Sequence, residues 1–317
     1  MKGVYTLKLD FVKGHMGGNT IIFLNGTQIP KGRELEISLN LLEKSYLGGD
    51  EAAILYPPQN EGNLKVKISE PASGEFIGAC GGMTQVLGKV LFETAVGANL
   101  GITPREPVTP VVLETDNGLT NIMVYLMKGN VVKVVTDMTS FVKKCYQHGV
   151  HPMEICGVKV MRVGEFMAVN GDRIKEVCPT ADVENLDSET RQILLDVQKE
   201  FMEKTKEPYN ITLYDWHPSY EGDLRAVFPH RIPELIETSC GTGTVVLALA
   251  ILESGELDKS KISAEKNCLL RIECGGGANL IGPDLTELTF QLKDNKIEKA
   301  FFTHNNVQIT SQGWVTL

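Results

Sequence analysis

Two cysteines stand in matching contexts. Around Cys80 the chain reads IGACGGMTQVLGKVL, and around Cys240 it reads ETSCGTGTVVLALAIL. In both segments the pattern Cys-Gly-x-x-Thr leads directly into an apolar run that predicts a buried helix. Free backbone N–H groups and the positive end of the dipole at a helix start favour a thiolate and lower the pKa of a cysteine there. The same N–H groups can hold an anion such as a carboxylate.

Two such cysteines facing one carbon would be an acid–base pair. A thiolate that removes a proton from one face, with a thiol that returns one on the other face, inverts that carbon. A positioned acid or base typically contributes about 10²–10⁴-fold to the rate. Fixed donors that stabilise the developing negative charge must supply the rest.

Three other interpretations apply to these segments. A buried cysteine is commonly a small apolar side chain with no catalytic role. The Gly-Thr-Gly-Thr stretch at 241–244 could hold a phosphate, but it lacks a lysine at P-loop spacing. A redox pair of Cys80 and Cys240 is a further alternative, although neither lies in a Cys-x-x-Cys motif. The paired context favours catalysis.

The cysteines lie 160 positions apart in a chain of 317 residues, which suggests two related halves. We expect an N-terminal lobe over 1–128, to which strands at about 304–317 return, and a C-terminal lobe over 129–303. Strands are expected at 4–9, 20–24, 52–56, 64–69, 111–114, 122–126, 158–162, 211–214 and 224–228, with more from 268 onward. Helices are expected at about 35–42, 82–95, 188–205 and 245–252.

Composition narrows the class of protein. Charged residues make up 22% and hydrophobic residues 42%, and 31 Lys+Arg against 40 Asp+Glu give a net charge of −9. An acidic chain argues against nucleic acid or an anionic membrane as partner. The N-terminus lacks the apolar core of a signal peptide, and no apolar run reaches the roughly 18–20 residues of a membrane span. Seven cysteines, an odd number, indicate reduced thiols. We therefore expect a cytoplasmic location.

The cysteine segments, with FVKGHMGGNTIIFL near the start, resemble the cofactor-independent diaminopimelate epimerase and proline racemase superfamily. YLGGDEAAILYPP, YNITLY and VQITSQGWVTL follow in the order that the family has. The resemblance implies an α+β fold like that of diaminopimelate epimerase. It has two pseudo-symmetric domains, each of mixed and antiparallel β-structure wrapped around a central helix, with the active site in the cleft between them. It implies no pyridoxal phosphate or other cofactor, and no metal.

The same resemblance implies site residues. Cys80 and Cys240 would be the catalytic acid and base, and the substrate α-carboxylate would rest on the N–H groups that follow them. The substrate-binding positions carried over are Asn19, Gly81, Gly82, Asn210, Gly241 and Thr242. The expected function is a racemase or epimerase that acts on a small-molecule amino acid, and a homodimer is compatible with it.

Several positions depart from the diaminopimelate epimerase pattern. Glu51 replaces a glutamine, and Pro71 replaces an asparagine. The stretch 164–167 replaces Gly-Asn-Pro-His, and a Glu-Arg pair aligns with Pro229-His230 followed by Arg231. The groups that hold the distal end of diaminopimelate are therefore mostly missing, and His230 and Arg231 remain binding candidates.

Negative charge at the distal end of the pocket predicts a different substrate. If Glu51 and Glu165 line the pocket, a matching substrate carries a distal cation, as lysine, ornithine, arginine and histidine do. Glutamate side chains are usually exposed on the protein surface, so only the alignment places these two in a pocket. The alternative functions are an isomerase of unsaturated carboxylic acids, diaminopimelate epimerase itself and a non-catalytic amino-acid-binding protein.

One Cys/His cluster suits a metal. Cys145, His148, His151 and Cys156 lie within CYQHGVHPMEIC, and zinc prefers such ligands. Their spacing fits no common zinc finger, so we expect a turn with incidental Cys and His. His15 is a candidate for the pocket lining, with loop packing as the equal alternative. Trp216 and His217 follow a strand and are candidates for a lid, with a surface turn as the equal alternative.

Overall fold

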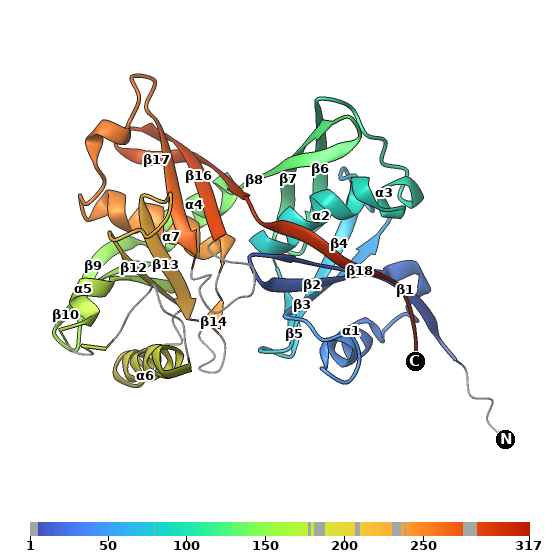
Figure 1. The fold of residues 1–317 in the computed structure, drawn as a ribbon, viewed down its shortest axis with the longest axis horizontal. Helices are drawn as coiled ribbons and strands as arrows, with labels where there is room; N and C mark the ends of the chain where they lie inside the picture. Colours follow the sequence, from blue (N-terminus) through green and yellow to red (C-terminus); the bar gives the residue numbers. More distant parts are fainter. Residues whose placement is uncertain are drawn as a thin grey trace. The chain divides into compact units, whose positions relative to one another are not determined.

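A computed structural model describes residues 6–78, 80–176, 179–180, 188–206, 210–229, 236–237, 239–274 and 284–317. Contacts divide the chain into two compact units, one of residues 1–136 with 307–317 and the other of residues 137–306. Both contain strands and helices, so the fold is α+β (Figure 1). No helix among the described residues combines the length and apolar character that a membrane crossing needs.

The first unit contains the first eight strands and the last one. Its strands are β1 (Lys8–Met16), β2 (Asn19–Asn25), β3 (Glu51–Tyr56), β4 (Leu64–Glu70), β5 (Glu75–Ile77), β6 (Val108–Thr115), β7 (Gly118–Met127), β8 (Asn130–Asp137) and β18 (Val307–Thr316). Its helices are α1 (Glu34–Leu42), α2 (Gly81–Glu93) and α3 (Val96–Asn99). Strand β18 pairs antiparallel with β1, so both ends of the chain belong to this unit (Figure 1).

The second unit contains the remaining elements. Its strands are β9 (Val150–Ile155), β10 (Val158–Val163), β11 (Phe166–Asn170), β12 (Asn210–Asp215), β13 (Leu224–Pro229), β14 (Ile236–Glu237), β15 (Asn267–Cys274), β16 (Asp284–Lys293) and β17 (Lys296–His304). Its helices are α4 (Thr139–His148), α5 (Gly171–Ile174), α6 (Ser188–Thr205) and α7 (Gly241–Glu253).

The two units repeat one pattern of strand pairing. In the first, β1–β2 is antiparallel, β2–β3 parallel, β3–β4 antiparallel and β4–β6 parallel, and β7 and β8 follow antiparallel. In the second, β10–β11 is antiparallel, β11–β12 parallel, β12–β13 antiparallel and β13–β15 parallel, and β16 and β17 follow antiparallel. Strands β5 and β14 add to β4 and β13 in the same way.

A buried glutamate closes a loop at matching places in both units. Glu114 and Glu273 each accept hydrogen bonds from three backbone N–H groups of a loop. The donors are Gln59, Asn60 and Gly62 in the first unit and Ser219, Tyr220 and Gly222 in the second. Each donor lies 160 positions from its counterpart, which is also the spacing of Cys80 and Cys240. The repeat therefore extends to individual hydrogen bonds.

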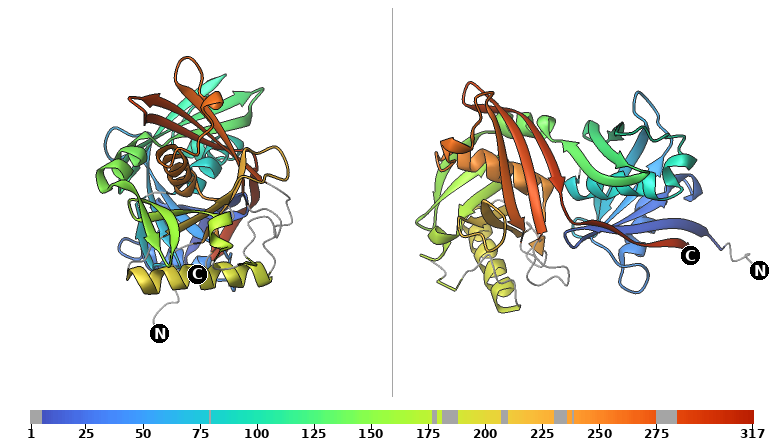
Figure 2. Two further views of the ribbon diagram at one scale, coloured as in Figure 1. Left: turned by 90° about the vertical axis from the view of Figure 1, so that its left-hand side faces the viewer. Right: turned by 45° about the horizontal axis from the view of Figure 1, so that its top comes forward.

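Each cysteine segment forms a helix at the centre of its unit. Helix α2 packs against β1, β2, β7 and β18, and α7 packs against β9, β10, β11, β12, β16 and β17. Figure 2 shows α7 nearly end-on with strands of its unit on several sides. Nearly every residue of α7 from Val245 to Ile251 is fully buried, which explains why this run is apolar on all faces. The prediction of a buried helix over 245–252 is confirmed.

Candidate functional site

Cys80 caps helix α2. Its backbone is extended, with φ −144° and ψ 123°, and its Sγ accepts a hydrogen bond of 3.1 Å from the N–H of Met83. Cysteine here takes the place that Ser, Thr, Asp or Asn usually takes at a helix N-cap. The Thr84 hydroxyl donates to the carbonyl of Gly81 at 2.7 Å and lies 2.6 Å from the Thr136 hydroxyl. The first turn of α2 is therefore fixed by side-chain bonds.

Cys240 caps helix α7 with nearly the same geometry. Its φ is −137° and its ψ is 120°, and its Sγ accepts a hydrogen bond of 3.5 Å from the N–H of Gly243. The Thr242 hydroxyl lies 3.2 Å from this sulfur, and the Thr244 hydroxyl donates to the Cys240 carbonyl at 2.7 Å. Both helices contain 13 residues. The motif Cys-Gly-x-x-Thr therefore builds the same helix start in each unit.

The N–H groups directly after each cysteine are available to a ligand. The first N–H groups of a helix have no partner within the helix. Within the described residues no hydrogen bond occupies the N–H groups of Gly81, Gly82, Gly241 or Thr242. A carboxylate is stabilised at such a position by these donors and by the helix dipole.

Asn19 lies beside the Cys80 helix start. A Cβ atom placed on Gly82 would be 3.2 Å from Asn19 Nδ2 and 3.6 Å from Cys80 Sγ, so glycine keeps this space open. Asn19 is buried, and its Oδ1 has no hydrogen-bond partner among the described residues. Because buried polar atoms are nearly always paired, this acceptor marks a place where a ligand could donate a hydrogen bond.

The environment of Cys240 differs from that expected of a helix start. Burial raises the pKa of the Cys240 thiol well above its usual range, and the Glu237 carboxylate raises it further through its charge and a hydrogen bond. Bonds from Thr242 and from the Gly243 N–H lower the pKa, but by less. At Cys240, desolvation and a nearby carboxylate therefore outweigh the helix terminus, and the pKa is raised instead of lowered.

Glu237 was not among the site residues expected from the sequence. It lies in β14, three residues before Cys240, and it is partly buried. A signal was present, because an acidic residue in the ETSC stretch is close enough along the chain to reach the cysteine.

The remaining predicted binding residues belong to different elements of the two units. In the first unit, Glu51 is buried at the start of β3. In the second unit, Asn210 is partly buried at the start of β12, and its N–H donates to the carbonyl of Glu165 at 3.4 Å. Glu165 is exposed in the turn between β10 and β11, and it lines a cavity of about 30 Å³ beside α4. His230 and Arg231 lie outside the described residues.

The Cys/His cluster is divided between a helix and a strand. Cys145 is buried in α4 and His148 ends that helix, whereas His151 is exposed in β9 and Cys156 lies in the next turn. Burial raises the pKa of the Cys145 thiol to about 12. The described residues contain no group of three or more His, Cys, Asp or Glu side chains that could hold a metal ion. The segment is a helix, a turn and a strand rather than a simple turn.

Trp216 and His217 are held by local bonds. Trp216 Nε1 donates to Glu256 Oε2 at 3.1 Å, and His217 Nε2 lies 3.5 Å from Asp172 Oδ2. Trp216 is therefore anchored to Glu256, and a role of these two side chains in a lid stays a prediction.

His15, Cys268 and Cys274 are buried side chains whose positions are explained by packing. His15 is buried, burial lowers its pKa, and its Nδ1 accepts from the Gly18 N–H at 3.4 Å. Cys268 and Cys274 are also buried, and burial raises the pKa of each thiol to about 11. Cys178 lies outside the described residues.

No family model matches the chain, and no curated protein matches it in sequence. Solved structures do match. A hydroxyproline epimerase from Agrobacterium vitis with bound trans-4-OH-L-proline has a TM-score of 0.65 and 14% identity, covering 98% of this chain and 93% of its own. The likeness shows that this chain shares its fold with the hydroxyproline epimerase.

Two further solved structures share this fold. A methylitaconate-delta-isomerase has a TM-score of 0.59 and 16% identity, covering 98% of this chain and 96% of its own. A Bacillus anthracis phenazine biosynthesis protein of the PhzF family has a TM-score of 0.61 and 11% identity, covering 98% and 99%. The resemblance that the cysteine segments carried is confirmed at the level of fold.

Proposed function

We propose that this chain is a cofactor-independent amino-acid racemase or epimerase that inverts an α-carbon by proton transfer between Cys80 and Cys240. The observation that carries the proposal is the matching pair of helix starts, each with a capping cysteine followed by N–H groups that no described residue occupies. The fold shared with a hydroxyproline epimerase and a methylitaconate-delta-isomerase supports an isomerase.

The two sulfurs have different starting roles in this proposal. Cys240 rests as a thiol, because burial and Glu237 disfavour its charged form. Cys80 is the base, since the Met83 N–H bonded to its Sγ and the α2 terminus stabilise a thiolate. The Cys80 thiolate takes the α-proton, and the Cys240 thiol gives its proton to the opposite face of the carbon. The product leaves Cys80 as thiol and Cys240 as thiolate, and the reverse reaction restores the first state.

The helix starts and Asn19 bind the rest of the amino acid. The substrate carboxylate accepts hydrogen bonds from the N–H groups of Gly81, Gly82, Gly241 and Thr242, which stabilise the charge that grows when the α-proton leaves. The buried Oδ1 of Asn19 accepts a hydrogen bond from the α-ammonium group, which satisfies an acceptor without a described partner.

Deuterium exchange at the α-carbon tests the proposal. The protein is incubated with a panel of amino acids in D₂O, and wash-in of deuterium and loss of optical activity are followed by NMR and polarimetry. Cys80→Ala and Cys240→Ala should each lower turnover in both directions by at least about 10²-fold. Cys268→Ala, at a buried thiol outside the helix starts, is the matched control and should retain activity. Full racemisation by either alanine variant would contradict the two-base mechanism.

We propose a substrate with a cationic side chain. Glu51 is a buried carboxylate in the first unit, and Glu165 is an exposed carboxylate in the second. Glu51→Gln and Glu165→Lys should lower kcat/KM for lysine, ornithine, arginine or histidine more than for uncharged amino acids. An unchanged substrate preference in both variants would remove this part of the proposal.

The alternative function is an isomerase of unsaturated carboxylic acids. The fold shared with a methylitaconate-delta-isomerase favours it, since an allylic proton shift needs the same carboxylate donors and a base. It needs no ammonium acceptor, so Asn19→Ala should damage a racemase and spare an isomerase of this kind. Including unsaturated acids and diaminopimelate in the panel separates these activities, and binding without exchange would indicate a non-catalytic binding protein.

A further inference from the structure

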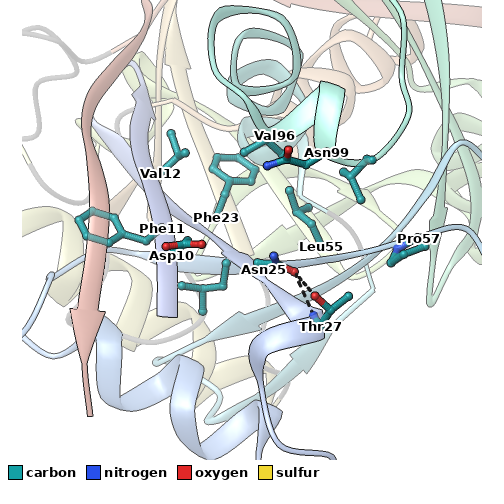
Figure 3. A pocket seen from close by; sticks show the side chains of 12 residues that line it. Asp10, Phe11, Val12, Phe23, Asn25, Thr27, Leu55, Pro57, Val96 and Asn99 are labelled. Carbon is teal, nitrogen blue, oxygen red and sulfur yellow. Dashed lines mark hydrogen bonds between the residues drawn. The ribbon is translucent and has the colours of Figure 1, made fainter. Parts of the chain in front are cut away.

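The first unit contains a cavity that the proposed reaction does not use. It has a volume of about 150 Å³ and lies between one face of the β1–β2–β3 sheet and helix α3 (Figure 3). Phe23 and Leu55 contribute from the strands, and Val96 and Leu100 contribute from α3 and the residue after it. We call this cavity the α3 pocket.

The fold explains why the sheet is left uncovered here. Helix α2 ends at Glu93, and α3 contributes only four residues, so the helical layer is thin at this end of the unit. Gly97 lets α3 approach the last turn of α2, because a Cβ atom at this position would overlap the carbonyl oxygen of Leu91. Cys80 is at the other end of α2, about 20 Å away for a helix of 13 residues. The pocket is thus separate from the Cys80 helix start.

The polar groups of the pocket carry a single charge. Asp10 is the only charged side chain among the 12 residues that line it, and no lysine, arginine or histidine is present. Gln28 fixes the Asp10 carboxylate, since its Nε2 donates to Oδ2 at 2.7 Å and its Oε1 accepts from the Asp10 N–H at 2.9 Å. Lys8, two residues earlier, places its Nζ 4.5 Å from the centre of the Trp314 ring. No described residue forms an ion pair with Asp10.

Size and charge together define the ligand. A cavity of about 150 Å³ with mainly apolar walls holds roughly one six-membered ring. A fixed carboxylate without an ion-pair partner attracts a cation and repels an anion. We propose that the α3 pocket binds a primary amine whose apolar group is about one ring in size, with the ammonium group at Asp10. The proposal depends only on the first unit and stands or falls independently of the proposed catalytic function.

Calorimetric titration of the full chain with benzylamine tests the pocket. Benzyl alcohol has the same shape without the charge, and benzoate reverses the charge. We expect saturable binding of benzylamine, weaker binding of the alcohol and still weaker binding of benzoate. Asp10→Asn should weaken benzylamine binding roughly 2- to 5-fold and leave the alcohol unchanged, as expected for a solvent-exposed ion pair.

Filling the pocket provides the decisive variants. Val96→Phe and Leu100→Phe place a ring in the cavity from the helix side, and either should abolish benzylamine binding while circular dichroism and thermal unfolding report an intact fold. Cys80→Ala should bind benzylamine as the unmodified chain does, because the pocket is at the other end of α2. Binding of benzoate equal to that of the amine, no binding of benzylamine, or unchanged binding in a folded filled variant would overturn the proposal.

Discussion

The hydroxyl network in the first turn of α2 makes a quantitative prediction. Thr84 bonds to the Gly81 carbonyl and to the Thr136 hydroxyl, and Thr136 also accepts from Gln85 Nε2 at 2.8 Å. Thr84→Val keeps the side-chain volume and removes two hydrogen bonds. Gly81 retains its helical partner, and Thr136 still accepts from Gln85 Nε2. Because the single Thr84 hydroxyl proton goes to Gly81, the buried Thr136 O–H is the donor to Thr84 and loses its acceptor in the variant. At about 0.5–1.5 kcal/mol per bond, the variant should lower the free energy of unfolding by about 1–3 kcal/mol.

Thr244→Val is the matched control in the second unit. Thr244 is buried like its counterpart, but among the described residues its hydroxyl has one partner, the Cys240 carbonyl, which also accepts the Thr244 N–H at 3.0 Å. Its replacement removes one bond and should lower stability by about 0.5–1.5 kcal/mol. The ratio between the two variants therefore tests the network in α2 and not merely the loss of a threonine.

Hydrogen exchange is the appropriate assay, because two compact units need not unfold together. Exchange of the α2 amides should accelerate in Thr84→Val, and exchange of the α7 amides should accelerate less in Thr244→Val. If Thr84→Val leaves α2 protection within about 0.5 kcal/mol of the unmodified chain, the two hydrogen bonds do not stabilise the helix start as argued.

Three further outcomes are expected. Alkylation of Cys240 by iodoacetamide should be slow at about pH 8, because the pKa of its thiol is raised. Glu237→Gln should accelerate this alkylation. Fast alkylation of Cys240 in the unmodified chain would contradict the proposal that it rests as a thiol. Burial opposes the charge of Glu114, but its backbone hydrogen bonds prevail and lower its pKa below 4.5. The ionised Glu114 carboxylate therefore stabilises the fold above that pH, and this stabilisation is lost as the pH falls through the pKa of the folded state. The acid unfolding of Glu114→Gln should consequently depend less on pH than that of the unmodified chain. Gly243→Ala would push a Cβ atom into the Phe228 ring and should cost about 1–3 kcal/mol in thermal unfolding, whereas Gly82→Ala should fold and lose activity.

Local pattern predicted many of the elements. The expected helices over 35–42, 82–95 and 188–205 correspond to α1, α2 and α6, and the expected strand over 20–24 corresponds to β2. Two segments differ from what the sequence indicated. The expected strand over 4–9 begins outside the described residues, and its described end overlaps β1, which continues to Met16. Helix α4 was not expected, because its run FVKKCYQH mixes apolar with polar and charged residues. Packing of Val142 and Cys145 stabilises that helix, which local propensity alone does not reveal.

The sequence alone determined the two helix starts and their repeat, because an N-cap and an apolar run are local features whose spacing is written in the chain. Only the tertiary structure decided the direction in which the pKa of Cys240 shifts, since desolvation and the carboxylate of Glu237 depend on what packs around the sulfur. Three other features also depend on residues that are far apart in sequence. They are the Asn19 Oδ1 without a described partner, the loop-closing bonds of Glu114 and Glu273, and the α3 pocket. The burial of a side chain and the electrostatic field around it depend on all of its neighbours in space. The spacing of residues along the chain does not specify those neighbours.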